Sequence, residues 1–146
     1  MTHPLSPALI RRATLLAINL LFLMVWGFAG IGKLLGGMPA WFPEKFGGTF
    51  LASFPGLPAL FWLLVAGELL ALGLALAALV TGEFLASRTP RFLSAALAWS
   101  LFVFVQLGFG QWLTGEFNGA FQQFVYFAGT LVALQTVLRS PDSLRA

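Results

Sequence analysis

Apolar residues occur along this chain in long uninterrupted runs rather than in the short alternating patterns of a soluble domain. A helix needs about 20 mostly apolar residues to cross the ~30 Å hydrocarbon core of a bilayer. Four runs approach or exceed that length, at 13–33, 59–80, 92–113 and 120–138. We therefore predict an all-α integral membrane protein, a four-helix bundle in which residues 1–146 form a single membrane domain.

The first run could also suggest a cleaved signal peptide, because Arg11 and Arg12 precede it. Its apolar stretch is longer than the ~7–15 residues of a signal-peptide core, and no small-residue cleavage site follows it cleanly. We therefore interpret 13–33 as a retained span.

The connection between the first two spans, 34–58, is long and apolar for a loop. Phe42, Phe46, Phe50 and Phe54 recur at every fourth position, which places them on one face of a helix. We predict a short interfacial or re-entrant helix that covers the outer mouth of the bundle. The alternative is a Phe-rich loop at the level of the lipid headgroups.

Basic residues at the ends of the spans predict the orientation of the chain, because cytoplasmic ends carry an excess of Lys and Arg. One side would carry Arg11, Arg12, Arg88, Arg91, Arg139 and Arg145, and the other Lys33 and Lys45. We expect both termini to be cytoplasmic (N-in and C-in), in a bacterial cytoplasmic membrane.

Composition narrows the possible chemistry. Apolar residues make up 59% of the chain and charged residues 9%, which a soluble domain of 146 residues could not bury. The net charge of +3 comes from residues that flank apolar runs, so we expect no nucleic-acid partner. The chain has no cysteine, and its one histidine, His3, precedes the first span. Thiolate chemistry, iron–sulfur ligation and bis-histidine haem are thereby excluded, and we expect no metal site and no covalently bound cofactor.

Glu68 lies near the middle of the second predicted span, where an acid costs about 2.5–3.5 kcal/mol to insert. It should face the bundle interior, either as a functional proton, ion or ligand site or as a structural lock between helices. Lys33 is its candidate partner. The two side chains meet only if the first helix continues to about Leu35 or the outer mouth dips inward; otherwise Lys33 extends to the interface.

One face of the first span carries Lys33 toward the interior. Its residues follow i+4, i+3 spacing and are Asn19, Leu23, Trp26, Gly30 and Lys33. On the third span a similar inward stripe is expected from Trp99, Phe102 or Val103, Gln106 and Gly110. Close packing of the second span is expected along Gly67, Ala71, Ala75 and Ala78.

Further polar side chains fall in the outer half of the membrane: Gln106, Gln122, Gln123 and Tyr126. Individually each one suits a hydrogen bond between helices. Together with Glu68, Lys33 and Trp26, they predict a polar pocket with aromatic walls, which is the usual composition of a small-molecule site. The inner half offers mainly Asn19 and Ser100, too few for a continuous ion path.

Three short motifs resemble the DoxX-like family of small four-helix membrane proteins, over roughly the first 80 residues. They are Gly30-Ile31-Gly32-Lys33, Phe54-Pro55-Gly56-Leu57-Pro58 and Ala66-Gly67-Glu68-Leu69. The resemblance implies a four-helix fold and makes Lys33 and Glu68 candidate family features. Some members of that family are membrane subunits of quinone-linked oxidoreductases, such as the thiosulfate:quinone type.

The residues and the resemblance together lead us to expect an accessory or quinone-interacting subunit of a membrane redox complex, not an enzyme on its own. Its partners would be the lipid bilayer and other membrane subunits or a second copy. A quinone or lipid head group would bind Lys33, Gln106, Gln123 or Tyr126, with Glu68 handling a proton. The alternatives are a small proton-coupled transporter that uses Glu68, and a purely structural membrane subunit.

Overall fold

The computed structural model describes residues 6–85 and 88–139, and all regular structure within these ranges is helical. Four helices are long and apolar enough to cross a membrane. The first is a continuous 30-residue helix, Pro7–Gly36, and the others are α4 (Leu57–Val80), α5 (Arg91–Leu113) and α6 (Phe117–Leu138). The predicted all-α fold with four candidate spans is confirmed.

The first helix is longer at both ends than the predicted span 13–33. It comprises α1 (Pro7–Trp26), a π-helical turn η1 (Gly27–Ile31) and α2 (Gly32–Gly36). Ser6 caps its start by accepting from the Leu9 N–H at 3.3 Å. Gly37, at a φ of 69°, ends it in a conformation that favours glycine. Hydropathy missed the first turns because Arg11 and Arg12 lie within them, although basic residues are fully compatible with helix.

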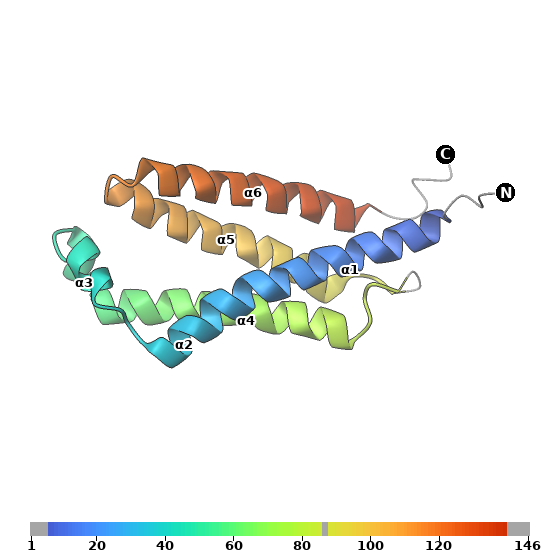
Figure 1. Ribbon diagram of the computed structural model, residues 1–146, viewed down its shortest axis with the longest axis horizontal. Helices are drawn as coiled ribbons and strands as arrows, with labels where there is room; N and C mark the ends of the chain where they lie inside the picture. The colour runs from blue at the N-terminus through green and yellow to red at the C-terminus, as the bar shows by residue number, and fades with distance from the viewer. Residues whose placement is uncertain (1–5, 86–87, 140–146) are drawn as a thin grey trace.

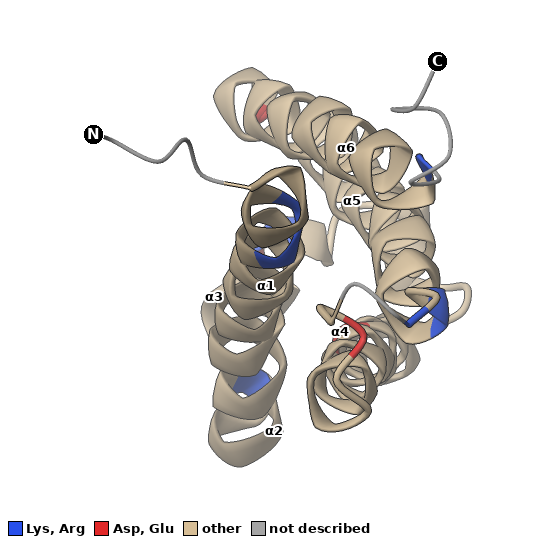
Figure 2. Cartoon of the chain, turned by 90° about the vertical axis from the view of Figure 1, so that its right-hand side faces the viewer, with Lys and Arg blue, Asp and Glu red and all other residues tan. Residues whose placement is uncertain are grey.

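The four long helices run in alternating directions, so the molecule has two distinct ends (Figure 1). We call one the α3 end, because it holds the α2–α4 connection and the turn between α5 and α6. The other is the arginine end, where Arg11, Arg12, Arg88, Arg91 and Arg139 lie (Figure 2). The described Lys and Arg residues therefore divide between the two ends as predicted. His3 and Arg145, which the sequence analysis also named, lie outside the described residues.

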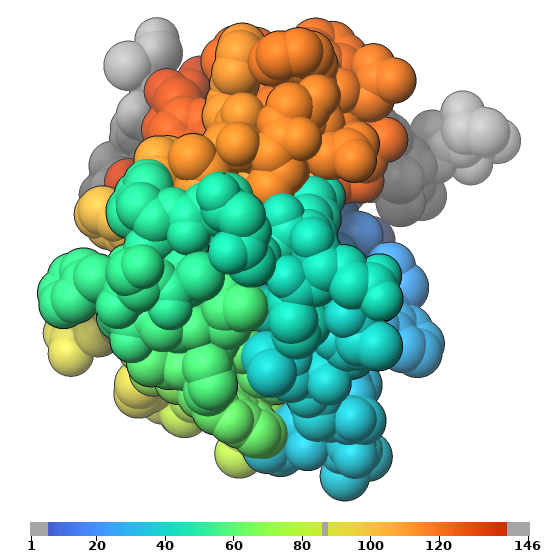
Figure 3. Space-filling model, turned by 90° about the vertical axis from the view of Figure 1, so that its left-hand side faces the viewer, coloured from blue at the N-terminus to red at the C-terminus, as the bar shows by residue number. Residues whose placement is uncertain are grey.

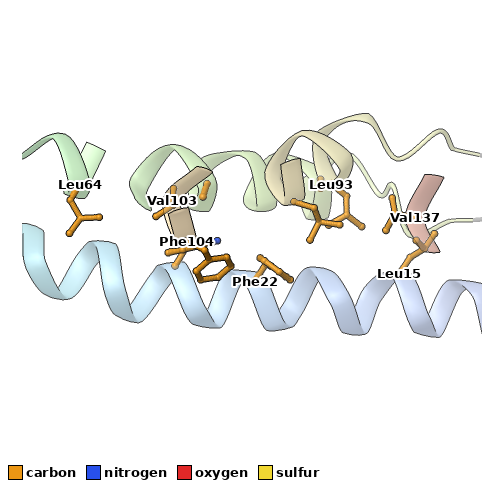
Figure 4. Packing of buried hydrophobic residues seen from close by; sticks show 11 residues of the cluster. Leu15, Phe22, Leu64, Leu93, Val103, Phe104 and Val137 are labelled. Atoms are coloured by element: carbon orange, nitrogen blue, oxygen red, sulfur yellow. The ribbon is translucent and has the colours of Figure 1, made fainter. Parts of the chain in front are cut away.

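Helix α5 lies between α4 and α6, and α1 packs mainly against α4. Near the arginine end α1 also approaches α6, because Leu15 and Val137 belong to one buried cluster (Figure 4). Phe22, Leu93 and Phe104 continue that cluster along the bundle. A second buried cluster, which includes Phe42, Phe46 and Phe61, lies at the α3 end.

Small residues on α4 allow α1 and α5 to pack closely, as expected. Gly67, Ala71, Ala75 and Ala78 are all buried. Asn19 of α1 joins this interface. With its amide oriented so that both its nitrogen and its oxygen are hydrogen-bonded, the nitrogen donates to the Ala75 carbonyl at 2.9 Å and the oxygen accepts from the Leu79 N–H at 3.1 Å. Asn19 therefore acts as a hydrogen-bonding link between helices.

The connection between α2 and α4 covers part of the α3 end of the bundle and leaves the turn between α5 and α6 uncovered (Figure 3). It contains a six-residue helix, α3 (Trp41–Phe46), and one 3₁₀ turn, η2 (Phe50–Ala52). Phe42 and Phe46 are buried, whereas Phe50 and Phe54 are exposed, so the predicted four-residue stripe is wrong beyond Phe46.

Gly47 explains where the stripe ends. A Cβ at this position would lie 2.6 Å from the Pro43 carbonyl oxygen, so only glycine fits the turn that follows α3. The chain then changes direction, and Leu51 rather than Phe50 packs into the core. An interfacial or re-entrant position for α3 stays a prediction.

Candidate functional site

Lys33 and Glu68 form an ion pair between the first helix and α4. The Lys33 Nζ lies 2.7 Å from Oε1 and 2.9 Å from Oε2 of Glu68. The Glu68 side chain is 1% exposed, whereas that of Lys33 is 28% exposed. A buried carboxylate is tolerated when a cation and hydrogen bonds satisfy it, and Lys33 supplies both.

The length of the first helix makes this pair possible. Because the helix continues to Gly36, Lys33 lies in its last turn, where the backbone is still helical and packs beside α4. Gly30 packs directly on α4: a Cβ there would lie 3.4 Å from the Glu68 Cβ and 3.1 Å from the Leu69 Cδ2. The absence of a side chain at Gly30 therefore brings the two backbones close enough for the lysine to reach the acid.

The π-helical turn lies directly before Lys33. Such turns are rare, appear mostly as single turns within α-helices and often mark functional sites. Here the turn spans Gly27–Ile31, and the Ala29 carbonyl within it accepts from the Lys33 Nζ at 3.4 Å. Periodicity did not predict this turn, since one extra residue in a helical turn leaves no clear trace in a hydrophobic pattern.

Trp26 joins the ion-pair region to the core. Its indole Nε1 donates to the Ser100 Oγ at 2.8 Å, and that hydroxyl donates to the Ala96 carbonyl at 2.7 Å. Its ring packs on Phe104 with 5.1 Å between centroids. The predicted inward stripe of the first span is thus largely right, but Phe22 is buried where Leu23 was expected, and Leu23 is only partly buried.

A groove of about 550 Å³ lies between the first helix, α5 and α6, and we call it the lateral groove. Its polar lining residues are Lys33, Glu68, Gln123, Tyr126 and Thr130, and its walls include Trp26 and Phe104. Leu21, Val125 and Tyr126 also line it and are 50%, 47% and 50% exposed. The groove therefore opens on the side of the bundle, with the ion pair in its depth.

The structure divides the four polar candidates of the outer half. Gln123 and Tyr126 line the lateral groove, whereas Gln122 is exposed and does not line it, so a pocket role for Gln122 stays a prediction. The inward face of α6 runs through Gln123, Tyr126 and Thr130 at i, i+3 and i+7, which turns Gln122 outward. Gln123 Oε1 is buried and has no hydrogen-bond partner among the described residues.

Gln106 lines a second hollow, a cavity of about 210 Å³ that we call the α3 cavity. It lies beneath α3, and its polar lining residues are Lys33, Lys45, Gln106 and Gln111. Phe42, Phe46 and Phe61 form much of its apolar wall. The single polar pocket predicted from sequence is therefore two hollows, with Lys33 at the boundary of both.

The inward stripe predicted on α5 is only partly buried. Val103 is buried, but Trp99 and Phe102 are exposed, at 37% and 69%. Trp99 lies at the edge of the α4–α5 contact, where its Nε1 donates to the Gly67 carbonyl at 2.9 Å. Because α5 is packed on both sides, by α4 and α6, its buried surface follows two directions rather than one stripe.

Glu83 is a buried residue that sequence reasoning missed. Its two carboxylate oxygens accept from the backbone N–H groups of Phe92 and Leu93, each at 2.8 Å, at the start of α5. A carboxylate at a helix N-terminus satisfies free N–H groups and interacts favourably with the helix dipole. The cap comes from eight residues before the helix, so no local capping motif signalled it.

The site thus holds an ammonium–carboxylate pair, a phenol and an amide oxygen to which no described residue donates, around a groove that opens sideways. Such groups bind, orient and exchange protons with a polar head, while the walls accept an apolar body. Comparisons of this chain with protein-family models, with curated proteins and with solved structures find no match in any of the three, so its function has to be inferred from these residues.

Proposed function

We propose that this chain is a DoxX-like membrane protein whose lateral groove binds the head group of a membrane quinone, and that it serves as an accessory subunit of a membrane redox complex. The observation that supports this most is the position of the Lys33–Glu68 pair in the depth of a groove with an exposed apolar rim. A quinone has matching parts: a polar ring and a long apolar tail that stays in lipid.

The groups in the groove suit both redox forms of the ring. A quinone carbonyl accepts hydrogen bonds, and the Lys33 ammonium and the Tyr126 hydroxyl are donors. A quinol hydroxyl donates, and Gln123 Oε1 is a buried acceptor without a partner in the described residues. Glu68 is the one carboxylate in the groove and is the candidate to take up or release a proton.

Electron transfer would need a partner. The sequence has no cysteine and only one histidine, so this chain offers few ligands for an iron–sulfur cluster or haem of its own. Most of the apolar surface of helix α6 is uncovered, since only 11% of its most apolar 18-residue stretch is buried. Other membrane subunits or a second copy are the expected neighbours there, besides lipid.

The proposed orientation places the arginine end in the cytoplasm and the α3 end outside, with α3 at the outer interface. The excess of Arg at one end supports it, since basic residues are retained on the cytoplasmic side. A bacterial cytoplasmic membrane is the proposed location.

A second candidate function is a small proton-coupled transporter that uses Glu68. It is favoured by one observation: Lys33 lines both the lateral groove and the α3 cavity, so the ion pair lies between two hollows. Against it, the lateral groove ends at the level of Ile18 and Ala133, and a packed apolar cluster that includes Leu15, Leu93 and Val137 occupies the bundle beyond that level. Transport of a polar solute would require that cluster to open.

The direct test uses a short-tailed quinone and its quinol, titrated anaerobically into the detergent-purified protein. Trp26 lines the groove, so binding should change the tryptophan fluorescence. We expect Gln123→Met to weaken quinol binding about tenfold, the value of one buried hydrogen bond. Gln122→Met is the matched control and should bind like the wild type, because Gln122 is exposed on the neighbouring surface.

The unliganded Gln123→Met protein should melt no lower than the wild type, because the substitution removes a buried oxygen that has no partner in the described residues. If neither redox form binds the wild type, or if Gln123→Met and Gln122→Met bind alike, the quinone proposal is wrong. Proton-dependent flux in sealed vesicles that is lost in Glu68→Gln would instead support the transporter.

A further inference from the structure

The geometry points to a second ligand site, separate from the lateral groove: the α3 cavity binds a small amphiphilic anion, a carboxylate with an aromatic or short aliphatic body, through Lys45. This inference is independent of the quinone proposal. It rests on the charges of the cavity, on the way Lys45 and Gln111 are held, and on the apolar character of the remaining wall.

The charge of the α3 cavity is entirely cationic among its lining residues, all of which are described. Lys33 and Lys45 line it, and no carboxylate does. Glu68 already neutralises Lys33 from the groove side. Glu44, the neighbour of Lys45, is exposed and makes no ion pair within 6–85 and 88–139. The ammonium of Lys45 therefore makes no ion pair with any residue of 6–85 and 88–139.

Lys45 is nevertheless turned toward the bundle. It is partly buried, its Nζ lies 6.0 Å from the centroid of the Phe46 ring, and it donates to Gln111 Oε1 at 2.8 Å. An ammonium has three N–H donors, and Gln111 is the one hydrogen-bond partner that the described residues give it. Donors remain available for a ligand in the cavity.

Gln111 is fixed by close packing against the start of α6. A Cβ on Gly119 would lie 2.8 Å from the Gln111 Cδ and 2.9 Å from its Oε1, so the amide fills the space left by that glycine. The Lys45–Gln111 contact is thus a supported arrangement between α3 and α5, rather than a chance approach of two surface side chains.

The other wall defines the kind of anion. Phe42, Phe46, Phe61 and Leu64 line the cavity, and Trp41 and Phe109 at its rim are exposed. A strongly hydrated inorganic anion would lose its water against these side chains without replacement. A carboxylate with an apolar body matches both parts, with its charge on Lys45 and its body against the phenylalanines. The amide of Gln106 on α5 also lines the cavity, makes no hydrogen bond to any described residue and adds a donor to its wall.

The test compares benzoate with benzamide, which has nearly the same shape and no charge, by calorimetric titration of the whole protein in detergent. We expect benzoate to bind at least tenfold more tightly, since a hydrogen bond to a charged group is stronger than a neutral one. Lys45→Gln should abolish the preference for benzoate, and Lys45→Arg should retain most of it. Glu44→Gln, an exposed change on the same short helix, should keep or slightly strengthen it.

Gly119→Ala provides a second test of the site. The added methyl group should displace Gln111 without altering any charge, and benzoate binding should weaken severalfold. Thermal unfolding in detergent is the control for folding, and Lys45→Gln should melt close to the wild type, because Lys45 is only partly buried and makes no ion pair within the described residues. Equal affinity for benzoate and benzamide in the wild type, or an undiminished preference in a folded Lys45→Gln protein, would overturn the inference.

Discussion

The two members of the ion pair are not equivalent. Glu68 is almost completely enclosed, whereas Lys33 retains 28% of its side-chain exposure and borders the α3 cavity. An unpaired ammonium on a long flexible stem can move toward a more hydrated region, but an unpaired carboxylate fixed in the middle of α4 cannot. The cost of breaking the pair should therefore depend on which partner is removed.

Lys33→Met should lower the free energy of unfolding more than Glu68→Gln does. Loss of the lysine leaves a buried charge without its partner, which typically costs about 3–5 kcal/mol. The double variant Lys33→Met/Glu68→Gln should recover part of the loss, because no isolated carboxylate remains. Thermal unfolding in detergent measures all three, and equal losses in the two single variants would contradict the asymmetry.

Much of the site was predictable from single residues. An acid in mid-membrane is costly enough to identify Glu68, and its need for a cation identifies Lys33. Trp26 followed from helical spacing, and Gln123 and Tyr126 from their polarity near the start of the fourth span. The exposed Gln122 was grouped with them because adjacent residues on a helix differ by about 100°, and the sequence alone does not say which of two neighbouring glutamines faces inward. The two lysines and Gln111 of the α3 cavity come together only through tertiary packing.

At the scale of the helices, the π-helical turn and Gly30 together determine how the first helix meets α4. The turn at Gly27–Ile31 shifts the helical register just before Lys33, and Gly30 brings the turn against Glu68 and Leu69. A side chain at Gly30 would separate the helices at the level of the ion pair.

Gly30→Ala should lower the melting temperature of the detergent-purified protein. The added methyl group would approach Leu69 Cδ2 to 3.1 Å, and overpacking of this kind costs about 1–3 kcal/mol. Gly32→Ala is the matched control, because a Cβ there has no described atom within 4 Å and alanine favours helix by up to about 1 kcal/mol. A Gly30→Ala protein as stable as the control would argue against close packing at this point.

The existence of the four long helices was predictable, but their ends were not. Hydropathy detects the part of a helix that suits lipid, so it gave 13–33 for a helix that spans Pro7–Gly36. The length of α3 depends on Gly47, which ends the helix although the phenylalanine spacing continues. Local steric limits of this kind override a periodic pattern.

At the scale of the whole molecule, polarity is distributed unevenly along the bundle. The described arginines lie at one end and both lysines toward the other; the α3 cavity lies at the lysine end, and the lateral groove extends from Lys33 past Trp26 to Ile18 and Ala133. The proposed orientation therefore predicts which aqueous compartment reaches each end.

Cysteine labelling tests this orientation cleanly, because the chain has no cysteine of its own. Gly48→Cys and Asn118→Cys, exposed at the α3 end, should react with a membrane-impermeant maleimide on intact cells. Ser6→Cys and Thr89→Cys, exposed at the arginine end, should react only after permeabilisation. None of the four changes removes a charge. The reverse pattern would contradict the N-in/C-in orientation. If the two positions at one end were labelled from opposite sides of the membrane, the four-span topology would be wrong.

The sideways opening between the first helix and α6 also determines how a ligand of the lateral groove is supplied. Leu21 and Val125 at the rim face the surroundings of the bundle rather than either end. A quinone entering there comes from the acyl-chain region, so occupancy follows its mole fraction among the lipids and not its concentration in water. Adding lipid at constant total quinone should empty the groove by two-dimensional dilution, and in a cell the saturation of the site would follow the ratio of quinone pool to membrane area.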